Sequence, residues 1–126
     1  MRLKHGSFTD VGLLRVTNED AFSAEGELFI VADGMGGHNA GEVASALAVS
    51  VIKSGARQGL VDPVQFRDIV QQANTAIYTA SLDDTDQRGM GTTVTALTVL
   101  PGSVPRVMVA NVGDSRTYIF RDGELQ

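Results

Sequence analysis

The chain has 126 residues, of which 43% are hydrophobic and 20% charged, and its formal net charge is −5 at pH 7. This composition favours a folded domain and excludes a disordered chain, and the negative charge disfavours a nucleic-acid or anionic-membrane partner. The absence of cysteine excludes disulfides, thiolate metal sites and cysteine nucleophiles. No apolar run is long enough to span a membrane and the start of the chain lacks a signal-peptide core, so we expect a cytoplasmic location.

The first predicted elements are short extended segments. Residues 3–8 and 13–16 are plausible strands or an extended entry, and residues 21–24 predict another strand. The apolar run 28–32 has the length of a strand, and we expect it to be buried on both faces. Asp33 follows this run directly, so its carboxylate is held at a strand end. The glycines after Asp33 let the backbone approach a bound cation closely.

Two helices are predicted next. Residues 41–54 carry a wide apolar stripe, which is typical of a helix packed on a sheet, and Gly55 is a natural stop. The second helix is expected to end near Ala80. The polar and acidic residues 81–88 then predict an exposed loop.

The start of the second helix carries several independent signals. Asp62 is a suitable N-cap, Pro63 suits the first helical position, and Gln65 stands at capping-box spacing. Val61 and Phe66 are placed for a hydrophobic staple. These features predict a well-defined helix start.

Three later strands are predicted by β-branched or apolar composition: 92–100, 107–112 and 117–120. Asp122-Gly123 carries a strong two-residue hairpin signal. The second arm of that hairpin is cut short at Gln126, so we expect the front part of a longer domain. The order of strands, two helices and then strands favours an α+β fold.

Several acidic residues are weak signals individually. Together they suggest the binding of a divalent metal ion. Asp33 stands at a strand end, Glu19 and Asp20 can come close to it through an antiparallel pairing, and Asp114 stands at another strand end. Carboxylates and a backbone carbonyl are hard oxygen ligands that suit Mg²⁺ or Mn²⁺ rather than zinc. Arg15 could then hold the oxygens of a phosphate.

Four motifs in order make the chain similar to the N-terminal half of a bacterial metal-dependent serine/threonine phosphatase of the PP2C (PPM) family. These motifs are Arg15-Val-Thr-Asn-Glu19-Asp20, Asp33-Gly-Met-Gly-Gly-His38, Gly89-Met-Gly-Thr-Thr93 and Gly113-Asp-Ser-Arg116. The resemblance implies an α-β-β-α sandwich of antiparallel sheets flanked by helices. It implies that residues 1–126 are the N-terminal part of one such domain, incomplete at the C-terminus.

The resemblance also implies the ligands of two Mn²⁺ or Mg²⁺ ions. Asp33 matches the carboxylate that bridges both metals, and the Gly34 carbonyl matches a ligand of the first. Glu19 and Asp20 match acidic residues that hold metal-bound waters, and Asp114 matches the aspartate of a third, weaker site. The family's remaining metal-binding aspartates belong to later motifs that this chain does not contain.

The activity implied by the resemblance is hydrolysis of phosphoserine and phosphothreonine in proteins by a metal-bridging hydroxide. Arg15 matches the phosphate-binding arginine and acts with Asp33. His38 and a metal-bound water both stay open as the proton donor, because Met35 replaces the histidine that relatives outside bacteria often have. The implied partners are phosphorylated proteins and a cognate kinase. The alternatives are a non-catalytic module that binds a phosphoprotein or partner, and a nucleotide-binding domain, which suffers from the missing phosphate-loop lysine.

Overall fold

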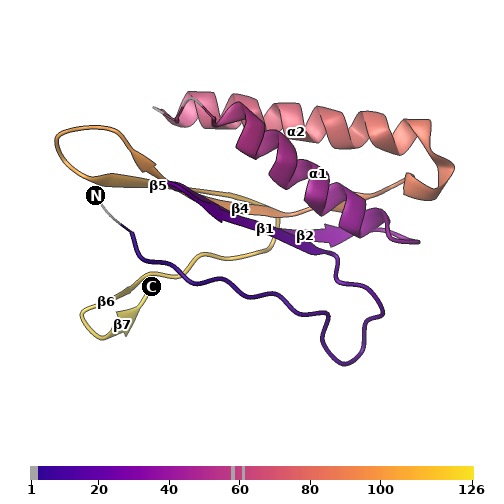
Figure 1. Ribbon diagram of the computed structural model, residues 1–126, viewed down its shortest axis with the longest axis horizontal. Coiled ribbons are helices and arrows are strands. Elements are labelled where there is room, and N and C mark those ends of the chain that lie inside the picture. The colour runs from indigo at the N-terminus through magenta and orange to yellow at the C-terminus, as the bar shows by residue number, and fades with distance from the viewer. Residues whose placement is uncertain (1–2, 58, 61) are drawn as a thin grey trace.

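The computed structural model describes residues 3–57, 59–60 and 62–126. Two helices cover one face of an antiparallel sheet, and the N-terminal segment and a C-terminal hairpin lie on the other side (Figure 1). The elements in chain order are β1 (Asp20–Glu25), β2 (Leu28–Met35), α1 (Ala40–Gly55), α2 (Pro63–Asp83), the 3₁₀ turn η1 (Thr85–Gln87), β3 (Gly91–Thr92), β4 (Val94–Leu100), β5 (Arg106–Val112), β6 (Phe120–Arg121) and β7 (Glu124–Leu125).

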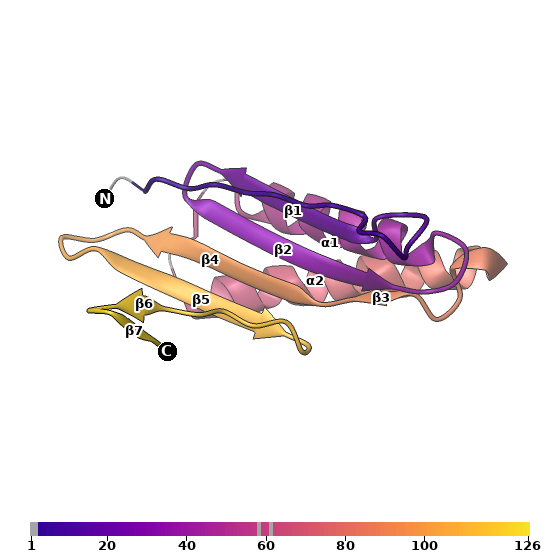
Figure 2. The ribbon, with the colours of Figure 1, turned by 90° about the horizontal axis from the view of Figure 1, so that it is seen from below.

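The main sheet brings several predicted site residues to one end. Its strand order is β1-β2-β4-β5, and β3 pairs with the last residues of β2 (Figure 2). In this register Asp20 faces Asp33, Val31 faces Thr95, and Thr95 faces Asn111. The start of β1, the end of β2, the start of β4 and the end of β5 therefore meet at the same end of the sheet.

The core lies between the sheet and α1. Ile30 and Ala32 of β2 and Ala96 of β4 belong to one cluster with Ala48 and Ile52 of α1, and each of the five is at most 3% exposed. The alanines let the helix lie close to the strands. Burial of such side chains is the main stabilising contribution to a domain of this size.

The predicted N-terminus of α2 is confirmed. Asp62 is the N-cap, and its Oδ1 accepts a hydrogen bond of 2.8 Å from the Gln65 backbone N–H. Pro63 occupies the first helical position, where its missing N–H costs nothing. The expected staple from Val61 to Phe66 involves a residue outside the described ranges.

The helices pack tightly where α1 ends. A Cβ on Gly55 would lie 2.9 Å from two side-chain carbons of Ile69 in α2. Gly55 is thus required by close helix contact. It is the last residue of α1, where the sequence predicted a stop, but its backbone is not left-handed and Ala56 is the C-cap.

The prediction of an exposed loop over 81–88 is wrong for residues 81–83, whereas most of residues 84–88 are exposed and lie outside the α-helix. α2 continues to Asp83, and η1 follows after the cap residue Asp84. Ser81 is only 8% exposed, and its hydroxyl donates to the Tyr78 carbonyl at 2.7 Å. This bond within the helix satisfies a polar side chain that would otherwise favour a loop.

The prediction that 28–32 is buried on both faces is also wrong. Burial alternates along β2, so that Ile30 is 1% exposed and Val31 is 53% exposed. The helices cover one face only, and the other face has scattered cover such as the edge-to-face contact of His5 with Phe29. An apolar run alone does not reveal whether a second layer covers the strand.

The strands expected over 3–8 and 13–16 are absent from the described part of that segment. Leu13 and Val16 are almost fully exposed, because this segment has no neighbouring strand to pair with.

The strands predicted later in the chain agree more closely with the structure. The strand expected over 92–100 is present, but is interrupted at Thr93 to give β3 and β4.

The C-terminal hairpin is confirmed at its turn. Both Asp122 and Gly123 have positive φ, at 54° and 85°, as the tight primed turn of a hairpin requires. The strand expected over 117–120 is reduced to β6, and its short partner β7 is present.

Taken together, the elements confirm the predicted α+β class with an antiparallel sheet and flanking helices. No helix among the described residues is long and apolar enough to cross a membrane.

Candidate metal centre

Glu19, Asp20 and Asp33 lie together at the end of the sheet, and we call them the acidic edge. Asp20 and Asp33 are direct partners in the antiparallel pairing of β1 with β2, and Glu19 precedes Asp20. Side chains of directly opposed residues stand on the same face, about 5 Å apart at Cβ. The Asn18 side chain accepts a hydrogen bond of 3.0 Å from the Asp20 N–H, which fixes the turn into β1.

The carboxylates of the acidic edge repel one another electrostatically. Partial burial raises the pKa of the Asp20 carboxyl above its ordinary value of 3.8, and the Asp33 and Glu19 carboxylates add to this rise. Asp20 is nevertheless an exposed residue, so its carboxylate stays open to solvent. A divalent cation between these groups would remove the repulsion.

Two glycines bring the backbone of α1 against the acidic edge. The Gly34 N–H donates to the Glu19 carbonyl at 3.1 Å. A Cβ on Gly34 would lie 2.7 Å from that carbonyl oxygen, and a Cβ on Gly41 would lie 2.5 Å from Oε1 of Glu19. A Cβ on Gly34 would also overlap the Gly41 carbonyl oxygen, so a larger residue at Gly34 would push the first turn of α1 away from the site. A larger residue at Gly41 would first displace the Glu19 carboxyl group.

Threonines hold the backbone of Asp33 from the other side. The Asp33 N–H donates to Thr93 Oγ1 at 3.1 Å, and the Thr93 N–H donates to the Asp33 carbonyl at 2.9 Å. Thr92 Oγ1 also donates to that carbonyl, at 3.0 Å. Thr93 Oγ1 shares a further hydrogen bond of 2.9 Å with Ser115 Oγ. Asp33 is therefore anchored through its backbone, and its carboxylate is left available.

Asp114 lies at the same end of the sheet but apart from the acidic edge. It follows Gly113 just after β5, and β4 separates β5 from β2. Two strand spacings correspond to about 10 Å. Within residues 3–57, 59–60 and 62–126, no three His, Cys, Asp or Glu side chains are grouped closely enough to hold a metal ion. The structure thus brings Glu19, Asp20, Asp33 and Gly34 together without completing a ligand set.

Arg15 reaches the acidic edge through Glu19. Its Nη1 lies 3.3 Å from Glu19 Oε2, and its side chain is 76% exposed, whereas that of Glu19 is 18% exposed. Exposed ion pairs of this kind contribute little to stability. The guanidinium is therefore free to turn toward an anion beside the acidic edge.

His38 lies in the loop between β2 and α1, and is exposed with a φ of 49°. Asn39, the next residue, also has a left-handed backbone and forms no side-chain cap. No hydrogen bond of the His38 ring is present within the described part of the chain. Its position near the acidic edge leaves it as one of the two open proton donors.

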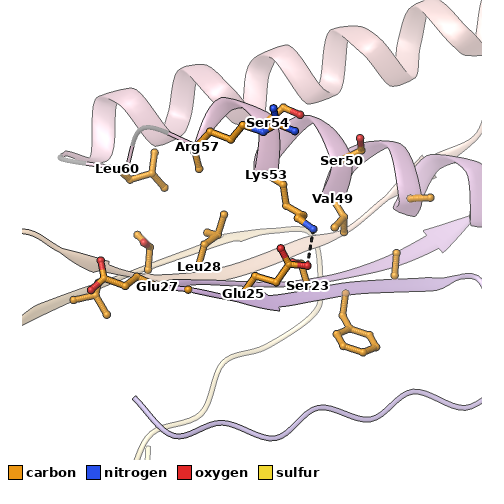
Figure 3. A pocket seen from close by; sticks show the side chains of 18 of the residues that line it. Ser23, Glu25, Glu27, Leu28, Val49, Ser50, Lys53, Ser54, Arg57 and Leu60 are labelled. Carbon is orange, nitrogen blue, oxygen red and sulfur yellow. Dashed lines mark hydrogen bonds and ion pairs between the residues drawn. The ribbon is translucent and has the colours of Figure 1, made fainter. Parts of the chain in front are cut away.

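A cavity of 1070 Å³ lies at the opposite end of the sheet, between the β1–β2 turn and the C-terminal half of α1 (Figure 3). Lys53 spans it to reach Glu25, with 2.9 Å between Nζ and Oε1. Leu28 and Leu60 are among its apolar lining. The cavity contains no residue of the acidic edge and is separate from the candidate metal centre.

Sequence reasoning missed two residues that support the site. Thr93 was singled out only as part of the Gly89–Thr93 motif, and its hydroxyl links Asp33 to Ser115. Ser45 is fully buried in α1, and its hydroxyl reaches the Glu19 carbonyl at 2.6 Å. A serine in the apolar stripe of α1 was the available signal, because such a hydroxyl needs a partner.

An antiparallel sheet that presents carboxylates, a close-packed glycine and an arginine at one end defines an α+β protein with a candidate site for a hard cation. The profile of the family described as Protein phosphatase 2C matches residues 16–126. The chain belongs to this phosphatase family.

Named relatives agree with this membership. The chain is 39% identical over 130 residues to "Serine/threonine protein phosphatase PstP" of Mycobacterium tuberculosis, covering 98% of this chain and 24% of that protein. It is 36% identical over 134 residues to "Serine/threonine phosphatase stp" of Listeria monocytogenes, covering 97% and 52%. The chain therefore spans from about a quarter to about half the length of these curated relatives.

Solved structures show the same fold. The PstP catalytic domain in complex with two manganese ions matches with a TM-score of 0.80 and 39% identity, over 90% of this chain and 49% of that one. The phosphatase MsPP from Mycobacterium smegmatis in complex with cacodylate gives a TM-score of 0.82 and 36% identity, over 94% and 49%. The arrangement of sheet and helices is thus that of about half of a PPM phosphatase domain.

Proposed function

We propose that residues 1–126 form the N-terminal part of a single phosphatase domain, whose activity is the metal-dependent hydrolysis of phosphoserine and phosphothreonine in proteins. The direct opposition of Asp20 and Asp33 at the sheet end is the observation that carries this proposal. Membership of the phosphatase family and the naming of its relatives support it.

The residues present fit a hard divalent cation such as Mn²⁺ or Mg²⁺. Carboxylate and carbonyl oxygens are the donors that these ions prefer. Burial raises the pKa of Asp20, and the neighbouring Asp33 and Glu19 carboxylates raise it further. The close backbone approach at Gly34 leaves its carbonyl unobstructed by any side chain of its own. When bound, two such ions polarise phosphate oxygens and lower the pKa of water.

Each residue then has a defined part. Asp33 and the Gly34 carbonyl would hold the ions directly, and Glu19 and Asp20 would orient the waters around them. Asp114 stands at the same sheet end and would join a further, weaker site. Because the described residues gather fewer than three such ligands in one place, the proposal requires additional carboxylates from elsewhere in the domain.

Arg15 would bind the phosphate of the substrate. Its guanidinium is exposed and tethered to the acidic edge by Glu19, so it can offer two N–H groups to phosphate oxygens. The proton for the leaving group would come from His38 or from water. The substrate class is phosphorylated proteins, with a cognate serine/threonine kinase and a cytoplasmic location as further parts of the proposal.

Hydrolysis of p-nitrophenyl phosphate by the full-length protein with added Mn²⁺ tests this function. Asp33→Ala should lower kcat/KM by at least about 100-fold, since it removes a directly acting metal ligand. Asp68→Ala is the matched control, because Asp68 is an exposed residue of α2 and, within the described part of the chain, its side chain contacts only its neighbour Arg67 by hydrogen bond or ion pair. Equal rates for wild type and Asp33→Ala would contradict the assignment.

A second candidate is a non-catalytic module that binds a phosphoprotein or another partner. The absence of a three-residue ligand group in the described ranges favours it. Calorimetric titration of the full-length protein with Mn²⁺ separates the two. Submicromolar binding supports the enzyme, and no binding supports the module.

A further inference from the structure

We infer that Ser45 is a positioning residue, which locks α1 onto the acidic edge by holding the Glu19 carbonyl. This inference rests on the proposed function, because the group it positions belongs to the candidate metal centre. It adds a residue from the middle of a helix to a site otherwise built from strand ends.

The Ser45 hydroxyl has two acceptors within reach and one proton to donate. Its Oγ lies 2.6 Å from the Glu19 carbonyl and 3.2 Å from the Glu42 carbonyl in its own helix. Serine in a helix commonly bonds back to the preceding turn. Here the shorter distance is the one to the Glu19 carbonyl, so the hydroxyl donates its proton to a hydrogen bond between α1 and the acidic edge.

The Glu19 carbonyl has both of its acceptor positions occupied. One receives the Ser45 hydroxyl at 2.6 Å and the other receives the Gly34 N–H at 3.1 Å. Helix, first strand and second strand therefore meet at one oxygen atom. Ser45 is fully buried, so water has little access to replace its hydroxyl.

Neighbouring contacts link this hydrogen bond to the rest of the candidate metal centre, so that it fixes the position of α1 relative to the site. The Gly41 backbone, one turn before Ser45, lies against the Glu19 carboxyl group, and that group pairs with Arg15. A shift of α1 would thus move the Glu19 side chain, the Gly34 backbone and the tether of Arg15 together. Loss of the Ser45 hydroxyl should loosen metal binding more than it slows the chemical step.

The test is Ser45→Ala in the full-length protein, with two matched buried serines as controls. Ser81→Ala removes a bond inside α2, to the Tyr78 carbonyl, and Ser23→Ala removes a buried hydroxyl that has no hydrogen-bond partner among the described residues. We expect the half-saturating Mn²⁺ concentration to rise by about 10-fold in Ser45→Ala, the size typical of residues that orient metal ligands. We expect kcat at saturating Mn²⁺ to change less than about 3-fold, and neither control to move either parameter.

Amide exchange of Gly34, measured by NMR without metal, gives a second readout. Ser45→Ala should speed exchange of the Gly34 N–H by about 10-fold, since its acceptor loses a fixed position. Ser45→Cys keeps the side-chain size with a much weaker donor, so it should resemble Ser45→Ala. This variant also serves if Ser45→Ala does not fold.

The outcomes separate this inference from the proposed function. If wild type binds no Mn²⁺, the proposed function fails, and Gly34 exchange still tests the role of Ser45. The inference is overturned if both Ser45 variants match Ser81→Ala in Mn²⁺ dependence and Gly34 exchange. It is also overturned if Ser45→Cys matches wild type, because packing and not the hydrogen bond would then be responsible.

Discussion

Asp20 and Asp33 lie directly opposite each other across the β1–β2 pair, at the one end of the sheet where β4 begins and β5 ends. Like charges in directly opposed strand positions destabilise a sheet. A domain that places two carboxylates in this way gives up stability unless a cation occupies the site.

Asp20→Asn should stabilise the metal-free protein, because it removes one of the two opposed charges. We expect a gain of about 0.5 kcal/mol at pH 7, the size of a cross-strand charge pair. Since the folded-state pKa of Asp20 is raised above 3.8, the wild-type penalty is fully present above that raised pKa and disappears as the pH falls below 3.8. Thermal unfolding of both proteins with EDTA, at pH 7 and near pH 3.5, measures this. A variant less stable than wild type at pH 7 would contradict the repulsion.

Gly34→Ala should destabilise the fold and weaken Mn²⁺ binding together. Its Cβ would overlap the Gly41 carbonyl oxygen and lie 2.7 Å from the Glu19 carbonyl oxygen, so α1 and the backbone at Glu19 would have to move away from β2. Overpacking of this kind costs about 1–3 kcal/mol. Gly37→Ala is the control, because a Cβ there meets nothing within 4 Å. Denaturant unfolding and Mn²⁺ titration of both variants check the prediction, and similar behaviour of the two would refute the close-packing argument.

Thr93→Val should weaken Mn²⁺ binding by freeing the backbone of Asp33. The variant keeps the side-chain shape and leaves the Asp33 N–H without its acceptor, at a cost of about 1–3 kcal/mol. Thr93→Ser keeps the hydroxyl and should retain most of the affinity. Calorimetry on the two variants provides the comparison. Equal losses in both would show that the methyl group matters and the hydroxyl does not.

Asp62→Ala should lower stability without changing metal affinity. Asp62 caps α2 through the Gln65 N–H, and loss of such a cap costs about 1 kcal/mol. The cap lies at the far end of α2 from the acidic edge (Figure 1). Urea unfolding should therefore show a lower midpoint, with an unchanged Mn²⁺ titration. A parallel loss of Mn²⁺ affinity would mean that global stability, and not local geometry, governs the site.

The sequence revealed those features that depend on near neighbours. The Asp62 cap and the Asp122-Gly123 turn are local, and both are present as predicted. The proximity of Glu19 and Asp20 to Asp33 was also within reach, because one tight turn joins the two strands and places Asp20 opposite Asp33.

Features that depend on distant segments were out of reach. Val31 is exposed because no second layer covers that face in the described residues, and nothing in the run 28–32 encodes this. The bond between Thr93 and Ser115 joins residues 22 positions apart, and that between Ser45 and Glu19 joins residues 26 apart. Such bonds depend on how the sheet and helices come together.

Anomalous diffraction from crystals of the full-length protein grown in excess Mn²⁺ would show directly whether the acidic edge holds metal ions. We expect manganese peaks within about 2–2.5 Å of the Asp33 carboxylate and the Gly34 carbonyl oxygen, with Asp20 facing them. A well-ordered structure with no manganese at Asp33, and with the Asp20 and Asp33 carboxylates free of any ion, would contradict this expectation.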